Sequence, residues 1–439
     1  MRFPKVLILG QTFNSRTGGG ITLTNLFREW PKENIAAISS NINEEWRLCS
    51  KQYLIGFRET KTIWPIYLFQ DNKDSAIIYG SEGNQYIPRL NELSKINKSF
   101  YSKSKNIIKS FLNYLGLFHF FKIIKITSEL NDFITKFSPD IIYTQLASLS
   151  LIRLVLKIQL KYNVPFVIHI MDDWPTTIYR KGLFGYFLNK FTHYSFRRLI
   201  KKSAACLSIS QKMSDEYSKR YGNKWSVFHN PIDIEKWIKV DQMKNISKNF
   251  IYTGRIGIAN FNSLLFFSTA IYRLKNEIPD INFTIYSPDF QNKLFLSCIK
   301  KFDNVLMHEP ISYNKIPSVL SKAKALVLPL DFDEKALKFA RFSMPTKATE
   351  YMASGIPIII FAPSKSAVAQ YAINCRWGLV VDKQDMVLLK KSIIDILMND
   401  HLRKTLIERS LYMSQKNHNA QKIRMEFKTL LISCLNERD

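Results

Sequence analysis

The sequence predicts an α/β protein of two domains, each built around a doubly wound parallel sheet. A chain of 439 residues is too long for one hydrophobic core and fits two domains of roughly 200 residues each. Short strand-like segments alternate with segments of helical spacing in both halves, which is typical of parallel sheets covered by helices. A hydrophobic content of 46% is sufficient for two packed interiors.

The first domain is expected to span residues 1–238. Its predicted strands are residues 5–10, 35–39, 140–144, 165–171, 204–208 and 225–229. Residues 150–162 have apolar side chains at helical spacing and are predicted to connect two of these strands. Residues 45–130 fit the repeat least, and we expect them to carry an insertion that faces a ligand or a membrane.

The second domain is expected to span residues 239–439, beginning with a polar stretch at residues 239–249. Its predicted strands are residues 250–253, 282–287, 304–308, 325–329, 356–362 and 378–381. Residues 403–435 form a charged tail with helical character. The two similar series of strands predict two domains of the same general design.

The net charge of +27 is an argument about partners rather than about fold. Residues 95–125 contain seven lysines and no acid, and residues 174–214 contain eight basic residues and no acid; both segments are rich in aromatic residues. Such segments favour peripheral contact with the anionic inner membrane, at about 1 kcal/mol per basic residue near the surface. A solvated helix face over a buried aromatic stripe is the alternative. Nucleic acid is not predicted as a partner, because no motif of a known nucleic-acid-binding module is present.

Other features of the composition favour a cytoplasmic protein that is soluble or peripheral at the inner face of the plasma membrane. The five cysteines are scattered and lack C-x-x-C spacing, so neither a disulfide framework nor a zinc site is expected. The apolar run at residues 110–121 is too short for a bilayer, which needs about 20 residues, and no signal peptide is expected. No metal site and no cofactor are predicted.

Residues 342–361 form the most informative segment, because they read as an anion-binding helix start that leads into a buried strand. Ser343 is expected to cap the helix, with Pro345 in its first turn and Gly355 at its end. Free N–H groups at a helix start attract phosphate, and Lys347 adds a full positive charge beside them. The segment therefore predicts a diphosphate site, although an ordinary helix between two strands has the same local pattern.

Two further side chains of this helix are candidate ligands of a sugar. Thr346 and Glu350 are four residues apart and share one helix face. A carboxylate at that depth can accept hydrogen bonds from sugar hydroxyls.

Candidate residues also follow several other predicted strands. Gly19 and Gly20 lie after the first strand, where backbone without side chains can approach a ligand, although a simple turn fits equally well. Asp173 follows the strand at residues 165–171 and is favoured over Asp172 and His169 as a site residue, because ligands of open α/β sheets gather at the carboxyl ends of strands. Arg255 ends the first strand of the second domain, and a guanidinium can bind phosphate bidentately.

Residues 342–361, together with residues 252–255, resemble the donor-nucleotide motif of GT-B glycosyltransferases in the large retaining family that builds bacterial polysaccharides. The resemblance implies two Rossmann-like domains facing an interdomain cleft, with the C-terminal helix crossing back to the first domain. It implies that Arg255 and the helix start, including Ser343 and Lys347, hold the donor diphosphate and that Glu350 binds the ribose. Gly19 and Gly20 would then line the cleft.

The activity implied by this resemblance is transfer of a hexose from a nucleotide-diphosphate sugar to a hydroxyl of a glycan or lipid-linked acceptor, in surface polysaccharide biosynthesis. The reaction would retain the anomeric configuration and need no metal, with Asp173, Arg255, Lys347 and Glu350 as catalytic residues. Alternatives are a GT-B nucleotide-sugar epimerase and a non-catalytic GT-B-like binding or scaffold subunit.

The sequence departs from the family pattern at three points. The first of two glutamates usual in the motif, which commonly contacts the transferred sugar, is replaced by Phe342. Glycines that usually follow are replaced by residues 343–345, and residues 256–265 lack the lysine usual after Arg255. Lys347 is therefore expected to supply the missing charge at the diphosphate.

Overall fold

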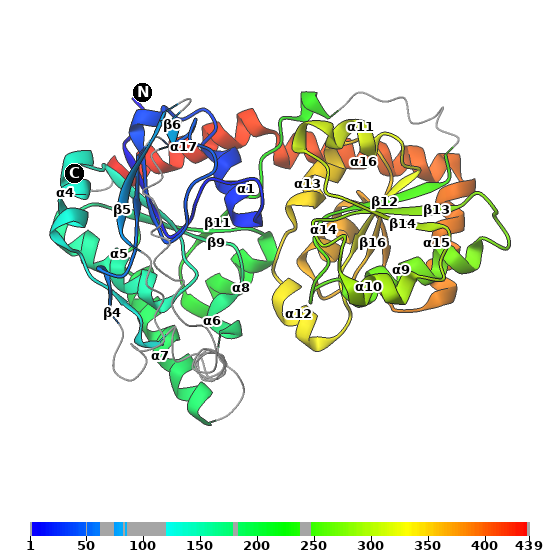
Figure 1. Ribbon diagram of the computed structural model, residues 1–439, viewed down its shortest axis with the longest axis horizontal. Coiled ribbons are helices and arrows are strands. Elements are labelled where there is room, and N and C mark those ends of the chain that lie inside the picture. The colour runs from blue at the N-terminus through cyan, green and yellow to red at the C-terminus, as the bar shows by residue number, and fades with distance from the viewer. Residues whose placement is uncertain are drawn as a thin grey trace, which may run out of the picture. The chain divides into compact units, whose positions relative to one another are not determined.

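The computed structural model describes residues 2–49, 51–61, 74–81, 84–85, 120–178, 183–237 and 247–436. The chain forms two compact units (Figure 1). Unit 1 comprises Met1–Phe228 and Arg424–Asp439, and unit 2 comprises His229–Ile423. The boundary predicted between residues 238 and 239 falls in residues 238–246, which lie outside the described residues.

Unit 1 contains a nine-stranded sheet in the order β11-β10-β9-β8-β1-β2-β3-β5-β6. Its strands are β1 (Val6–Leu9), β2 (Ile35–Ser39), β3 (Lys51–Leu54), β5 (Ala76–Ser81), β6 (Asn84–Gln85), β8 (Ile141–Gln145), β9 (Phe166–Ile170), β10 (Ala205–Ser208) and β11 (Trp225–Val227). The strands from β11 to β3 pair in parallel, and the six strands predicted for this half are all among them. The strand order reverses between β1 and β8, which is the arrangement of a doubly wound sheet.

The insertion predicted at residues 45–130 contributes the strands β3, β5 and β6 at one edge of this sheet. There β3 pairs antiparallel with β5, and β5 pairs antiparallel with β6. Two further short strands, β4 (Thr60–Lys61) and β7 (Ile123–Ile124), form a separate antiparallel pair. Residues 50, 62–73, 82–83 and 86–119 of the predicted insertion lie outside the described residues.

The first helices of unit 1 are α1 (Gly18–Leu26), α4 (Ser128–Phe137), α5 (Leu149–Tyr162), α6 (Trp174–Thr177), α7 (Leu183–Ile200) and α8 (Gln211–Tyr221). Four of them begin at a side-chain cap. The side chains of Thr17, Thr127, Ser148 and Ser210 each accept a hydrogen bond from a backbone N–H in the first turn of α1, α4, α5 and α8. The helix predicted at residues 150–162 is confirmed as α5.

Unit 2 contains a six-stranded, fully parallel sheet in the order β14-β13-β12-β15-β16-β17. Its strands are β12 (Asn249–Thr253), β13 (Asn282–Tyr286), β14 (Val305–His308), β15 (Ala325–Pro329), β16 (Ile358–Phe361) and β17 (Leu379–Val381). All six predicted strands are confirmed. The order reverses between β12 and β15, so the carboxyl ends of these two strands form the switch point of the sheet.

Helices cover both faces of this second sheet. They are α9 (Phe261–Leu274), α10 (Lys293–Ile299), α11 (Ile316–Leu320), α12 (Glu334–Ala340), α13 (Thr346–Ala353), α14 (Ala367–Cys375), α15 (Met386–Met398) and α16 (Asp400–His418). Figure 1 shows α9 and α10 on one side of the sheet and α16 on the other. A continuous apolar core joins α9, α10 and α15 to the sheet through buried residues such as Phe267, Phe283, Phe295 and Ile393.

The last helix, α17 (Ala420–Asn436), begins in unit 2 and continues in unit 1 from Arg424. Within unit 1 the Arg424 guanidinium donates to the Asn25 carbonyl at 2.8 Å and to the Glu29 carboxylate at 2.7 Å. The Phe427 ring packs edge-on against Phe27, with centroids 5.2 Å apart. The C-terminal helix therefore returns to the first unit, as the family resemblance implied. No helix in the described ranges is both long and apolar enough to span a membrane.

Candidate functional site

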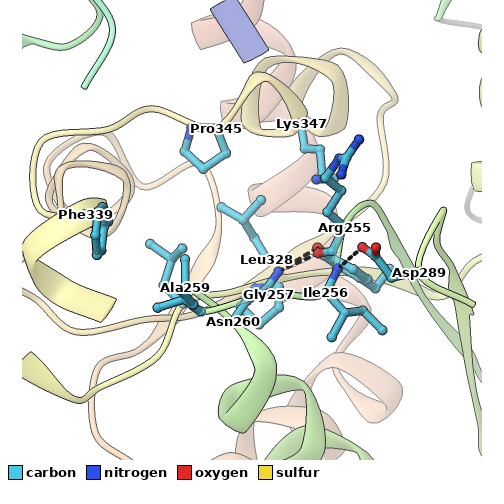
Figure 2. Close-up of a pocket in the computed structure, with 14 residues that line it drawn as sticks. Arg255, Ile256, Gly257, Ala259, Asn260, Asp289, Leu328, Phe339, Pro345 and Lys347 are labelled. Atoms are coloured by element: carbon cyan, nitrogen blue, oxygen red, sulfur yellow. Dashed lines mark hydrogen bonds between the residues drawn. The ribbon is translucent and has the colours of Figure 1, made fainter. Parts of the chain in front are cut away.

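A pocket of about 600 Å³ opens in unit 2 at the switch point of the parallel sheet (Figure 2). It is lined by the connection that follows β12, by the end of β15, and by residues near the start of α13. Ligands of doubly wound sheets bind at such carboxyl edges, because the connections diverge there and leave a crevice. The volume lies within the range of small-molecule sites.

Helix α13 presents its N-terminal end at this edge. The helix begins at Thr346, after Pro345 at the N-cap position, and no side chain caps it. The capping role expected of Ser343 is wrong, because its hydroxyl donates to the carbonyl of Phe339 at 2.9 Å. The helix ends as predicted, with Gly355 in the left-handed conformation at a φ of 68°. An uncapped helix start leaves N–H groups available for an anion.

Two cationic side chains meet at one end of the pocket. Figure 2 shows Arg255 and Lys347 beside each other, from the end of β12 and the first turn of α13. Lys347 passes directly over Gly254, where an added Cβ would lie 1.9 Å from its Nζ. Its ammonium lies 5.4 Å from the centre of the Tyr252 ring. Within the described part of the chain, no carboxylate lies within ion-pair distance of either cation.

The electrostatics of α13 reflect its buried setting. Glu350 is buried, and burial raises its pKa to about 7, although the positive charge of Lys347 opposes this. Burial also lowers the pKa of Lys347; Glu350 acts in the opposite direction and Arg255 adds to the lowering. Thr346 lies one turn before Glu350 on the same helix. The structure thus places Arg255, Thr346, Lys347 and Glu350 in one region of unit 2.

Two backbone donors in the connection after β12 already have partners within the protein. The amide of Ile256 donates to Asp289 at 2.9 Å, and the amide of Gly257 donates to Asn260 at 2.9 Å. The start of α9 is capped by Asp331, which accepts from the amide of Ser263. These contacts shape the connection after β12 and leave the α13 start as the anion-binding end of the pocket.

Sequence reasoning missed several residues of this pocket. Tyr252 donates its hydroxyl to the carbonyl of Arg255 at 2.6 Å and accepts from Asn260 at 2.7 Å, which fixes the turn that carries Arg255. Asp289 and Phe339 also line the pocket. The signal for Tyr252 was present at the end of a predicted strand, three residues before Arg255. Asp289 and Phe339 carry no local signal, because only the strand order brings them to this edge.

Phe342, which stands where the family motif usually has its first glutamate, is buried. The Arg341 guanidinium lies 5.2 Å from the centre of its ring. The aromatic side chain therefore serves packing within unit 2.

In unit 1, protein side chains occupy the space beside the two predicted glycines. A Cβ added at Gly19 would lie 2.6 Å from Gln11 and Gln145, and one added at Gly20 would lie 2.2 Å from Asn14. Gln145 also donates to the carbonyl of Gly19 at 3.1 Å. Close packing of these amide side chains explains both glycines, and their predicted contact with a ligand stays a prediction.

Asp173 is buried in unit 1, where its carboxylate has several partners. Tyr217 donates to it at 2.7 Å, Arg220 pairs with it at 2.8 Å, and Thr176 donates to it at 2.8 Å. These contacts give the carboxylate a structural role, joining the end of β9 to α8. Its predicted catalytic role is untested.

The two alternatives considered beside Asp173 lie in different environments. His169 is fully buried within β9, and its Nδ1 lies 2.6 Å from the hydroxyl of Tyr143. Asp172 is exposed.

Two family models match the sequence, one in each half. Residues 247–399 match a model described as glycosyl transferases group 1, and residues 98–236 match glycosyltransferase family 4. A comparison with curated proteins found no match.

Solved structures share the fold over nearly the whole chain. HepE of Anabaena, in complex with UDP and glucose, has a TM-score of 0.63 at 10% identity and covers 98% of this chain and 100% of its own. Sucrose-phosphate synthase of Thermosynechococcus elongatus has a TM-score of 0.62 at 12% identity and covers 99% of this chain and 100% of its own. A glycosyltransferase of Rickettsia africae has a TM-score of 0.61 at 11% identity, with 98% and 99% covered. With both family models and these neighbours in agreement with the two parallel sheets, the chain is a glycosyltransferase of the GT-B fold.

Proposed function

We propose that the protein transfers a hexose from a nucleoside-diphosphate sugar to a hydroxyl of a glycan or lipid-linked acceptor, with retention of the anomeric configuration. The observation that carries this proposal is the pairing of Arg255 and Lys347 at the uncapped start of α13. A diphosphate needs charge and N–H donors together, and this end of the pocket offers both. HepE, a structural neighbour, has been solved with UDP-glucose, UDP, and UDP with glucose.

The chemistry of the proposed step centres on the leaving diphosphate. As the bond between the anomeric carbon and the phosphate oxygen breaks, negative charge grows on that oxygen, and the cations and α13 amides stabilise it. The acceptor hydroxyl attacks from the same face, and its proton passes to the departing phosphate oxygen. The new glycosidic bond then has the configuration of the old one. Glu350 accepts hydrogen bonds from the ribose and orients the donor.

Replacement of either cation by alanine tests this assignment. We expect Arg255→Ala and Lys347→Ala each to lower turnover by about a hundredfold or more, since one donor to a developing oxyanion is worth roughly 3 to 4 kcal/mol. Lys338→Ala is the matched control, because Lys338 is an exposed cation of α12 that does not line the pocket. Turnover would be measured with labelled nucleotide sugars and a glycan or lipid-linked acceptor, after a thermal-shift screen of donors. A donor at 100 times its Kd stabilises the protein by about 2.7 kcal/mol.

Product analysis separates the proposed reaction from its competitors. The anomeric configuration of the product, read by NMR, should equal that of the donor. Free epimerised sugar in the absence of acceptor would instead indicate an epimerase. Unchanged turnover in both alanine variants would contradict the role given to the two cations.

A further inference from the structure

Helix α7 has one buried face and one exposed face of unusual composition. The buried face consists of Leu188, Thr192, Phe196, Leu199 and Ile200, which recur at helical spacing. The exposed face carries four aromatic side chains: Tyr186 (55% exposed), Phe187 (60%), Phe191 (42%) and Tyr194 (59%). Aromatic side chains gathered on the outer face of one helix mark an interaction surface, whereas single exposed apolar residues are normal.

Basic residues share this face with the aromatic rings. Lys190 lies 5.1 Å from the centre of the Tyr186 ring, and Arg198 lies 5.9 Å from the centre of the Tyr194 ring. Arg197 is also exposed, as are Lys201 and Lys202 just beyond the helix end. Residues 174–214 contain no acid, so this segment offers no negative charge to neutralise these cations.

A second basic, aromatic-rich segment meets this face. The ring of Phe120, near the end of residues 95–125, lies 5.1 Å from that of Phe191. Arg153 of α5 fixes Phe120 by donating to its carbonyl at 2.8 Å. The described end of this segment therefore packs against α7 at Phe120, while residues 95–119 lie outside the described residues.

We infer that the exposed face of α7 docks on the surface of an anionic phospholipid bilayer, with its aromatic rings in the headgroup region and its basic side chains against the lipid phosphates. Exposed aromatic residues interleaved with cations on a helix that does not span the membrane are the features of an interfacial helix. This inference does not depend on the proposed transfer reaction, since no residue of this face lines the unit 2 pocket.

Other occupants fit the face less well. A second copy of the chain bound through the same face would bring the same cations together, because a two-fold interface pairs each patch with itself. Single-stranded nucleic acid binds in basic grooves that follow its backbone, whereas this surface is the outer side of a helix.

Vesicle binding of the full chain tests the inference without donor or acceptor. Vesicles of phosphatidylcholine alone would be compared with vesicles that also contain phosphatidylglycerol, by co-sedimentation. We expect at least tenfold tighter binding to the anionic vesicles and loss of this preference at high salt. Lys190→Gln combined with Arg198→Gln should weaken binding to the anionic vesicles by about 25-fold, because the loss of each cation should weaken it about fivefold. Phe187→Ser should weaken it without changing the salt dependence.

A matched control is available on α16. Tyr412 is exposed, and Lys416 four residues later lies 5.7 Å from the centre of its ring, the same arrangement as in α7. Tyr412→Ser combined with Lys416→Gln should leave vesicle binding unchanged. Thermal melts would confirm that all variants are folded.

Three results would overturn the inference. The first is equal binding of the wild type to neutral and anionic vesicles, and the second is an equal loss of binding in the α16 control. The third is self-association, or binding of a single-stranded oligonucleotide, that depends on the α7 residues while vesicle binding does not.

Discussion

At the scale of single residues, Glu350 connects the pH of the solution to the proposed donor site. Burial raises its pKa to about 7 from a usual value of 4.5, so the carboxylate forms only near neutrality. If the carboxylate accepts hydrogen bonds from the ribose, affinity for the donor should fall about tenfold from pH 8 to pH 6. A nucleotide sugar is the right probe, since its diphosphate diester does not titrate in that range.

Glu350→Gln provides the comparison, because glutamine keeps the shape and loses the titration. Calorimetry should find weaker donor binding in the variant, with little change between pH 6 and pH 8. An equally steep pH dependence in the variant would assign the titration to another group. The raised pKa of Glu350 has the opposite effect on the stability of the free enzyme. The carboxyl group ionises at a lower pH in the unfolded state than in the folded state, so the free energy of unfolding falls as the pH rises from 4.5 towards 7.

At the scale of elements, the site depends on the contact between β12 and α13. The hydroxyl of Tyr351 in α13 accepts from the amide of Thr253 at 2.9 Å, which fixes the helix to the end of the strand. Gly254 follows at a φ of 142°, and the absence of a Cβ there leaves room for Lys347. The backbone of one element thereby sets the position of the cation on the other.

Gly254→Ala should therefore lower turnover by displacing Lys347, since the new Cβ would lie 1.9 Å from its Cε. Gly222→Ala is the matched control, because Gly222 also has a positive φ, of 85°, while nothing lies within 4 Å of its added Cβ. Both variants should lose about 1 to 3 kcal/mol of stability through backbone strain, and only Gly254→Ala should lose activity. Gly254→Ala combined with Lys347→Ala should be no less active than Lys347→Ala alone. A further loss in the double variant would show that Gly254 acts by another route.

The elements also show what the sequence could and could not predict. Buried strands such as β16 were predictable because continuous apolar runs between turn residues have few other uses. The edge pairing of β3 with β5 was not, since it depends on contacts between segments that lack a strong local pattern. The same limit applies to the pocket: Arg255 and Lys347 have local signals, whereas Leu328 and Asp289 join them only because β12 lies between β15 and β13.

At the scale of the whole molecule, the chain passes between its two units twice, after residue 228 and after residue 423. Both connecting segments are joined inside unit 2. The amide of Ile232 donates to the carbonyl of His418 at 2.8 Å, and the amide of Ala420 donates to the carbonyl of Ile232 at 3.0 Å. The buried ring of His418 and the half-buried ring of His229 lie 5.0 Å apart beside these bonds. This contact therefore joins the two connecting segments to each other.

Protonation of His418 should weaken that contact. Burial lowers the pKa of His418, and His229 lowers it further, while its Nε2 lies 3.1 Å from the hydroxyl of Tyr371. The unfolded state takes up a proton below a pKa of about 6.5 while the folded state does not, so stability should fall from pH 7 to pH 5.5. The protection factors of the Ile232 and Ala420 amides, which correct for the slower intrinsic exchange at lower pH, should fall over the same range. His418→Asn should be less stable at pH 7 and should respond less to pH. His401→Asn, an exposed histidine on the same helix, should respond as the wild type does. Parallel pH profiles for His418→Asn and the wild type would show that other groups cause the loss.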